Sequence, residues 1–179
     1  MNEISVRHAT PADASQIAAI HCASWREAYS SVLDEAFLAG PIEEDRRALW
    51  SDRLQKPDQA RITLLADVAQ AAPAAFVCGY RDLDPVWGSC INNLHVLPAL
   101  RGKGIGEHLM RSAARALAAE AKTVGVHVWT FEANQAALRF YRRLGGQVVE
   151  RGTSQIPAAK GATILRLFWP TLSAVADGS

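Results

Sequence analysis

Apolar residues recur at two different spacings along this chain, and the spacing predicts where strands and helices lie. Residues Ile4 to Arg7 alternate in the manner of a half-buried strand. The next residues, Thr10-Pro11-Ala12-Asp13, supply an N-cap, a proline at the first helical position and an acid in the first turn. A helix from Ala14 to about Tyr29 is expected to follow, because its apolar residues return every three or four positions and form one face.

The remaining segments alternate between the same two periods. Further helices are predicted at about Asp34–Leu38, Glu43–Leu54, Gly104–Ala121 and Asn134–Leu144, the first two separated by Gly40-Pro41. Further strands are predicted at Arg61–Asp67, Ala75–Asp82, Ser89–Leu97, Val124–Phe131, Gln147–Arg151 and Ala162–Phe168, with a turn around Ala72-Pro73. This order predicts a mixed sheet with helices packed on it, in one domain over residues 1–172. Residues 173–179 are small and polar, and we expect them to form a flexible tail.

Composition and charge narrow the function only by exclusion. The 179 residues are 49% hydrophobic and 21% charged, with a formal net charge of +1, so no overall field favours nucleic acid or an anionic membrane. No run of about 18 apolar residues is present, and the N-terminus lacks the apolar core of a secretion signal. Cys22, Cys78 and Cys90 are widely spaced, which favours a reduced, cytoplasmic protein. No histidines have metal-ligand spacing, and no metal is expected.

A glycine-rich loop, Arg101-Gly102-Lys103-Gly104-Ile105-Gly106, joins a predicted strand to a predicted helix. Its glycines allow the backbone to approach a ligand, and the free N–H groups of the next helix favour an anion such as a phosphate. The alternative is a plain glycine turn with solvated charges. A Walker loop requires Gly-Lys-Ser/Thr, and a dinucleotide fingerprint requires G-x-G-x-x-G near the start of a βαβ unit, so neither motif fits.

Two motifs in order resemble those of the GNAT acetyltransferase family. Leu94-His95-Val96-Leu97-Pro98 followed by Arg101-x-x-Gly104-x-Gly106 is similar to the acetyl-CoA-binding strand, loop and helix of that family. Asn134-x-x-Ala137-x-x-Phe140-Tyr141-x-x-x-Gly145 resembles its second cofactor motif. His21-x-x-Ser24-Trp25-Arg26-x-Ala28-Tyr29 is similar to a common variant of its acceptor-side helices. The resemblance covers about Ile4 to Phe168. It implies a three-layer α+β fold with a mixed, largely antiparallel central sheet flanked by helices.

The resemblance also implies roles for individual residues. The backbone of Leu94, His95 and Val96 would hold the pantetheine arm of acetyl-CoA, and residues Arg101, Gly102, Lys103, Gly104, Ile105 and Gly106 its pyrophosphate. Asn134 would contact the cosubstrate, although an N-cap role is compatible with this. Tyr141 would contact it as well and protonate the departing thiolate, whereas its helical spacing alone favours packing in the core.

The general base departs from the pattern of the family. Many relatives carry a glutamate on the central strand where this chain has Cys90. An alkyl ammonium must lose a proton before it attacks, so an ordered water chain, His95, Glu27 or an acceptor of low pKa remain alternatives. Cys90 itself is either an acyl-accepting nucleophile or, as strand cysteines more often are, buried and inert.

These residues together predict an N-acetyltransferase that moves an acetyl group from acetyl-CoA to a primary amine of a small molecule or protein. Trp25, Tyr29 and Trp87 either line the acceptor pocket or belong to the core. A sensor that binds acyl-CoA without turnover, or a structural domain that uses neither ligand, are the alternatives, the first motivated by the missing glutamate. The resemblance also allows a homodimer.

Overall fold

One seven-stranded sheet organises the molecule in the computed structural model, which describes residues 4–68 and 73–177. Its strands are β1 (Ile4–His8), β2 (Arg61–Val68), β3 (Pro73–Asp84), β4 (Gly88–Val96), β5 (Val126–Phe131), β6 (Gln147–Thr153) and β7 (Thr163–Trp169). They lie in the order β1-β2-β3-β4-β5-β7-β6, and every neighbouring pair is antiparallel except β4 and β5. The predicted mixed, largely antiparallel sheet is confirmed.

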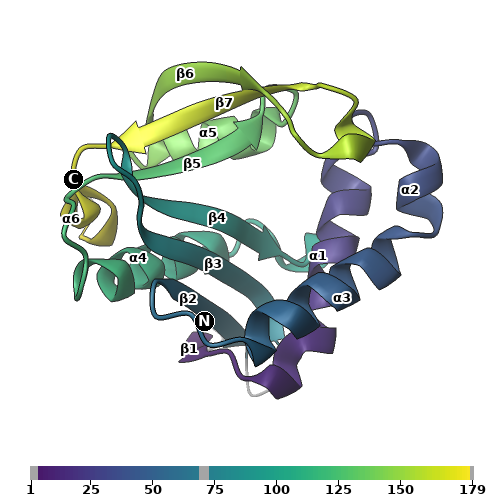
Figure 1. Ribbon diagram of the computed structural model, residues 1–179, viewed down its shortest axis with the longest axis horizontal. Helices are drawn as coiled ribbons and strands as arrows, with labels where there is room; N and C mark the ends of the chain where they lie inside the picture. Colours follow the sequence, from purple (N-terminus) through teal and green to yellow (C-terminus); the bar gives the residue numbers. More distant parts are fainter. Residues whose placement is uncertain (1–3, 69–72, 178–179) are drawn as a thin grey trace.

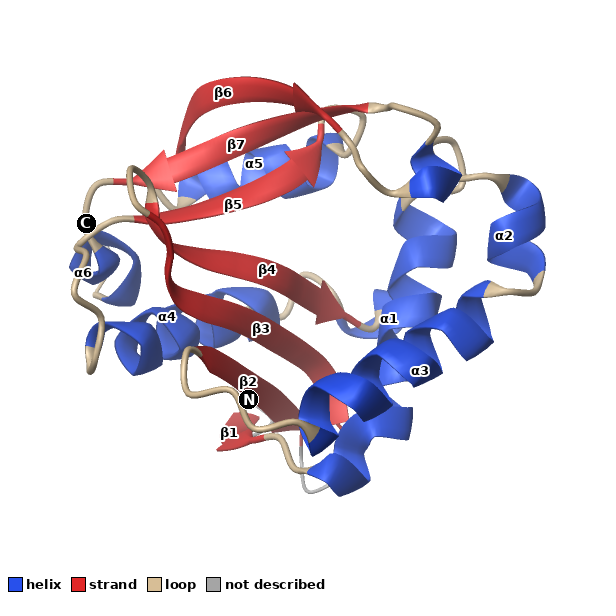
Figure 2. Cartoon of the chain, viewed as in Figure 1, coloured by secondary structure: helices blue, strands red, loops and turns tan. Residues whose placement is uncertain are grey.

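Helices cover both faces of this sheet (Figure 1). They are α1 (Ala14–Ala28), α2 (Glu35–Ala39), α3 (Ile42–Gln55), α4 (Ile105–Ala118), α5 (Gln135–Arg143) and α6 (Leu172–Ala176). All helices predicted from the apolar periodicity are present, with ends within a few residues of those expected. Figure 2 shows the resulting three layers, with α1 and α3 on one side of the strands and α4 on the other.

Alternating residues of the central strands pack into two hydrophobic cores, one on each face of the sheet. On β2, Leu64 packs with α4 while its neighbour Leu65 packs with α1 and α3. This is the period of two that a strand imposes on its side chains. The α4 face is the larger core, where Leu109, Met110 and Leu117 are fully buried. Both faces are therefore covered near β2 to β4, which fixes β4 in the middle of the molecule.

The sheet separates between β4 and β5. Their parallel pairing is limited to Ser89–Ile91 against Val126–Val128, and both strands continue for several residues beyond it. A β-bulge lies at the same place, because Cys78 of β3 opposes Asn93 whereas Gly79 opposes Ile91, so Asn92 has no partner. The bulge bends β4 and reverses the facing of the residues that follow. The carboxyl halves of β4 and β5 therefore diverge.

Helix α6 corrects the expectation for the C-terminus. Residues 173–179 are predicted to form a flexible tail, but residues up to Ala176 belong to this helix. Leu172, Val175 and Ala176 are buried against the core, and Arg115 of α4 donates a hydrogen bond to the Ala176 carbonyl at 2.9 Å. Five residues are too few to show helical periodicity in the sequence. Of the predicted turn at Ala72-Pro73, Ala72 lies outside the described residues and Pro73 begins β3.

Candidate active site

A cavity of about 400 Å³ occupies the space where β4 and β5 diverge. Its walls come from the second half of β4, the glycine loop, the first turn of α4, the middle of β5, α5 and the last turns of α1. The lining includes Leu94, His95, Val96, Arg101, Gly102, Gly104, Ile105, Gly106, Asn134 and Tyr141. Of the residues predicted to bind the cosubstrate, Lys103 alone is absent from this lining.

The glycine loop offers an anion-binding backbone. Gly102 and Gly104 have φ values of 76° and 80°, in the left-handed region that favours glycine. Gly104 is the N-cap of α4 and has no side chain to satisfy the first-turn amides. Within the described part of the chain, the N–H groups of residues 102–107 have no hydrogen-bond acceptor. Free amides at a helix N-terminus fit a phosphate group such as the pyrophosphate of coenzyme A.

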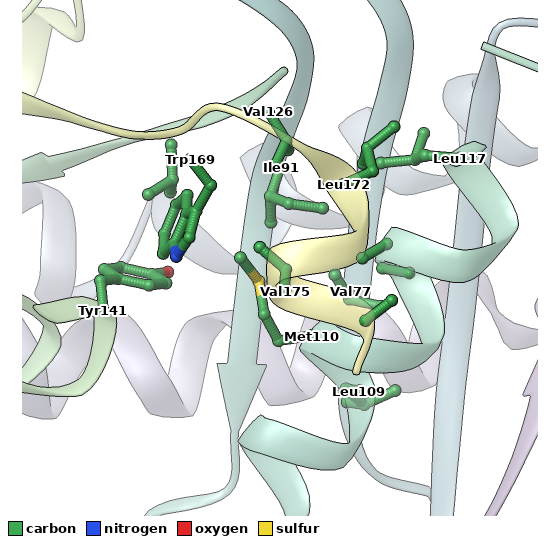
Figure 3. Packing of buried hydrophobic residues seen from close by; sticks show 14 of the residues in the cluster. Val77, Ile91, Leu109, Met110, Leu117, Val126, Tyr141, Trp169, Leu172 and Val175 are labelled. Atoms are coloured by element: carbon green, nitrogen blue, oxygen red, sulfur yellow. The ribbon is translucent and has the colours of Figure 1, made fainter. Parts of the chain in front are cut away.

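Tyr141 lies between the core and the cavity. It is 6% exposed, and its ring centroid is 6.0 Å from that of Trp169 in an edge-to-face arrangement, as Figure 3 shows. Burial raises the pKa of the Tyr141 phenol, with Tyr29 as a further cause. Among the described residues its hydroxyl has no hydrogen-bond partner. Tyr141 is thus both a core aromatic and a free proton donor at the cavity wall, so the two interpretations of the sequence are compatible.

Asn134 caps α5 and contacts α1. Its Oδ1 accepts the N–H of Ala137 at 3.0 Å, which confirms the predicted N-cap. Its Nδ2 donates to the Tyr29 hydroxyl at 3.3 Å. Because Asn134 lies on one side of the cavity and Tyr29 on the other, this hydrogen bond ties the β5–α5 corner to the end of α1.

A hydrogen-bonded chain connects the glycine loop to β4 through α1. Arg101 pairs with Glu27, and its Nη2 donates to Ser24 Oγ at 3.2 Å. Because a guanidinium only donates, Ser24 accepts this bond and its own hydroxyl is free to donate to His95 Nδ1 at 3.0 Å. Neutral His95 then carries its proton on Nε2. Burial, with Arg101 and Arg46 as further causes, lowers the pKa of His95 to about 3.

The position of the missing glutamate is filled by an inert thiol. Cys90 is 3% exposed and does not line the cavity. Burial raises its pKa to about 12, so the thiolate that a nucleophile requires is not populated near neutral pH. Of the two interpretations of Cys90, the geometry favours the buried, structural one. Glu27 is exposed and ion-paired with Arg101, outside the cavity lining.

The three aromatic residues considered for the acceptor pocket lie in three different environments in the structure. Tyr29 lines the cavity. Trp25 is buried in a core formed by α1, α2 and the β6–β7 connection. Trp87 lies away from the cavity, where it packs edge-to-face on Phe168 and contacts the Arg166 guanidinium. Ser24 and Asn93 are lining residues that the sequence analysis did not single out, although Ser24 is part of the quoted α1 motif.

The fold and the cavity are of the kind found in a family of acyl-CoA-dependent acyltransferases. The family model of the Acetyltransferase (GNAT) family matches residues 19–146, and the chain belongs to this family. Acetyl-CoA is the cosubstrate of the family, as the resemblance implied.

Solved structures support the fold. The PaiA N-acetyltransferase of Thermoplasma acidophilum, in complex with coenzyme A, matches with a TM-score of 0.72 and 16% identity over 92% of this chain and 98% of that one. A GCN5-related N-acetyltransferase of Rhodopseudomonas palustris matches with a TM-score of 0.72 and 21% identity over 95% and 97% of the two chains. Curated protein sequences contain no significant match.

Residues 4–68 and 73–177 contain neither a candidate membrane-spanning helix nor a candidate metal-binding cluster. None of the helices there combines the length and the apolar character needed to cross a membrane. No three histidine, cysteine, aspartate or glutamate side chains of these residues are grouped so that they could hold a metal ion.

Proposed function

We propose that this protein transfers the acetyl group of acetyl-CoA to a primary amine of a small molecule or a protein. The observation that carries the proposal is the convergence of three features on one cavity. These are the amides of the glycine loop, the half of β4 that has no strand neighbour on its β5 side and the free hydroxyl of Tyr141. Anion binding, carbonyl polarisation and protonation of a leaving group are the functions that thioester aminolysis requires.

The backbone of β4 is suited to orient the thioester. Beyond Ile91, β4 has no strand neighbour on its β5 side, so its N–H and C=O groups there are available to a ligand. The amide-containing pantetheine arm is a natural partner for such an edge. An N–H group near Leu94 is then positioned to polarise the acetyl carbonyl and to stabilise the oxyanion that forms when the amine attacks.

Tyr141 serves as the general acid in this proposal. The amine nitrogen bonds to the carbonyl carbon, the carbon–sulfur bond breaks, and the thiolate takes the phenolic proton of Tyr141, which the phenolate afterwards regains from water. The raised pKa keeps this phenol protonated until the thiolate appears. The amine must lose a proton as well, and the only carboxylate among the described lining residues, Glu107, lies in the first turn of α4 and pairs with Arg111. The depressed pKa of His95 makes it a weak base, so we propose that the acceptor enters as the neutral amine and releases its excess proton to water.

The replacement Tyr141→Phe tests the assignment. We expect thiol release from acetyl-CoA in the presence of amines to fall by about 100-fold or more, the usual contribution of general acid catalysis. The dissociation constant of acetyl-CoA, measured by calorimetric titration, should stay within about twofold because the ring and its packing remain. Tyr80→Phe, in which the same hydroxyl is removed outside the cavity lining, is the matched control.

Two results would contradict the proposal. Unchanged turnover in Tyr141→Phe would remove this residue from the acid role. Tight binding of acetyl-CoA without thiol release on any amine would instead support a sensor that binds the cosubstrate and does not turn over.

A further inference from the structure

Arg53 stands at the β4 bulge, in the last turn of α3. Its Nη1 donates to Asn93 Oδ1 at 3.0 Å and to Asn92 Oδ1 at 3.4 Å. Its guanidinium carbon also lies 5.1 Å from the centre of the Trp50 ring, in a cation–π arrangement, and Trp50 is fully buried. The side chain is half-buried and held from two sides, so the position of the cation is defined by the fold.

The charge of Arg53 is not balanced by a carboxylate within the described residues. Arg26 pairs with Glu43, Arg46 with Asp45 and Arg101 with Glu27, whereas Arg47, which has no such pair among the described residues, is exposed to solvent. Among the described residues, the hydrogen bonds of Arg53 go only to the neutral amide oxygens of two asparagines, and both bonds use Nη1. Its other N–H groups are left for a further acceptor. A half-buried cation without a counter-ion is costly unless an anion completes it.

Arg53 lies beside the acceptor end of the cavity. Asn92 and Asn93 line the cavity and directly precede Leu94, where the proposed oxyanion contact lies. The glycine loop lies at the other end of the same strand, and the five residues from Asn92 to Val96 span roughly 13 Å. Among the described lining residues, Glu107 is the only carboxylate, and it lies in the first turn of α4 at the loop end, where it pairs with Arg111. Arg53 is not itself a lining residue, but it is hydrogen-bonded to the two asparagines that line this end and is the cation that contacts them.

We propose that Arg53 binds a carboxylate of the acceptor, so that the preferred substrates are primary amines bearing a carboxylate a few atoms from the nitrogen. The proposal rests on the proposed N-acetyltransferase function. The guanidinium fork matches a carboxylate in two parallel hydrogen bonds, and Asn93 fixes the plane of the fork. Fixing the carboxylate directs the neighbouring amine toward the end of β4 that orients the thioester. Arg53 is in this sense a specificity-determining residue, which binds the substrate away from the reacting atoms.

Paired acceptors test the proposal directly. Amino acids and their carboxamides are compared as acceptors, with thiol release followed at saturating acetyl-CoA. The carboxamide has the more easily deprotonated amine, so this comparison is biased against the proposal. We expect kcat/KM of the wild-type protein to be at least about tenfold higher for the acid than for its amide, as the strength of charge-assisted hydrogen bonds implies.

Arg53→Gln should remove this preference. We expect KM for the acid to rise about 10- to 100-fold, with turnover of the amide and the dissociation constant of acetyl-CoA nearly unchanged. Arg47→Gln, on the exposed surface of the same helix, is the matched control and should keep the preference. If Arg53→Gln does not fold, Arg53→Lys keeps the charge and loses the fork, and should retain only part of the preference.

The possible failures are distinguishable. If neither the acid nor the amide of any pair releases thiol, the proposed transferase function fails. If both members react equally well, or if Arg53→Gln slows both by the same factor, the transferase stands and Arg53 is only a structural link between α3 and β4.

Discussion

Tyr141 and His95 are both buried, yet burial has a different consequence for each residue. Burial raises the pKa of the Tyr141 phenol and so preserves the proton that a leaving thiolate needs. Burial lowers the pKa of His95 and so removes the affinity for a proton that a base needs. Tyr141 therefore still holds its proton when the thiolate forms, and deprotonation of the amine is left to the solvent.

The pH dependence of turnover follows from this asymmetry. For an alkyl amine acceptor with a pKa near 10.4, we expect kcat/KM to rise about tenfold per pH unit from pH 6.5 to pH 9, because only the neutral amine reacts. Thiol release at constant ionic strength measures this slope. A plateau with a midpoint between pH 6 and pH 7 would instead reveal a basic group of the protein.

At the scale of elements, the start of α4 depends on the conformation of Gly104. In Gly104→Ala the new Cβ meets no atom within 4 Å, so crowding is not the problem. The φ of 80° is unfavourable for alanine, at about 1–2 kcal/mol, and a relaxed loop no longer directs its amides at one point. We expect the dissociation constant of acetyl-CoA to rise at least about tenfold in calorimetric titrations, with modest loss of stability.

Gly40→Ala provides the control for this change. Gly40 also has open space around its Cβ position, its φ of −141° is outside the left-handed region, and it lies outside the cavity lining. Affinity for acetyl-CoA should be unaffected. Equal weakening in both variants would show that the loop conformation of Gly104 is not what binds the pyrophosphate.

Helix α6 is a structural element rather than a loose end. Leu172 is 4% exposed and packs with the core on the α4 face. Leu172→Ala should lower the free energy of unfolding by about 2–4 kcal/mol in urea denaturation, whereas Ser173→Ala on the exposed side should change it little. If the two variants were equally stable, the C-terminal residues would be a dispensable tail after all.

Across the whole molecule, the sequence predicts helices and strands well where glycine and proline residues mark the ends of segments. Thr10-Pro11, Gly40-Pro41, Pro98 and Gly145-Gly146 mark the ends of long amphipathic segments, and the structure has its boundaries near each of them. The glycine loop and Asn134 could be predicted as cavity residues because their proposed roles depend on backbone conformation and on local spacing. Backbone conformation and spacing are both encoded in short runs of consecutive residues.

Other parts of the site depend on contacts that no local pattern encodes. Arg53 meets Asn93 only because the packing of α3 brings its last turn beside β4, and the bulge at Asn92 decides which side chains face the cavity. Ser24 and His95 are 71 residues apart in the chain. The same limitation applies to Trp87, whose place beside Arg166 follows from the pairing of distant strands. Sheet register, rather than sequence period, determines these contacts.

Burial of His95 makes the folded molecule sensitive to mild acid. The pKa of His95 is about 3 when folded and near 6.5 when unfolded, so the unfolded state binds more protons between these values and stability falls as pH drops below 6.5. By this linkage His95 should contribute a loss of about 2 kcal/mol between pH 7 and pH 5. In urea denaturation, the free energy of unfolding should fall between pH 7 and pH 5 by about 2 kcal/mol less in His95→Gln than in the wild-type protein. An identical loss in both proteins would assign the acid sensitivity to other groups.

The divergence of β4 and β5 gives the protein an open strand edge in the middle of its own sheet. Natural sheets usually protect such edges, because an exposed row of amide groups invites pairing with a foreign chain. A ligand that lies along β4 fills this gap as an additional strand would, and it binds the folded state alone. We therefore expect the supply of acetyl-CoA to govern more than the rate of the reaction: when it is scarce, the molecule is also most prone to self-association.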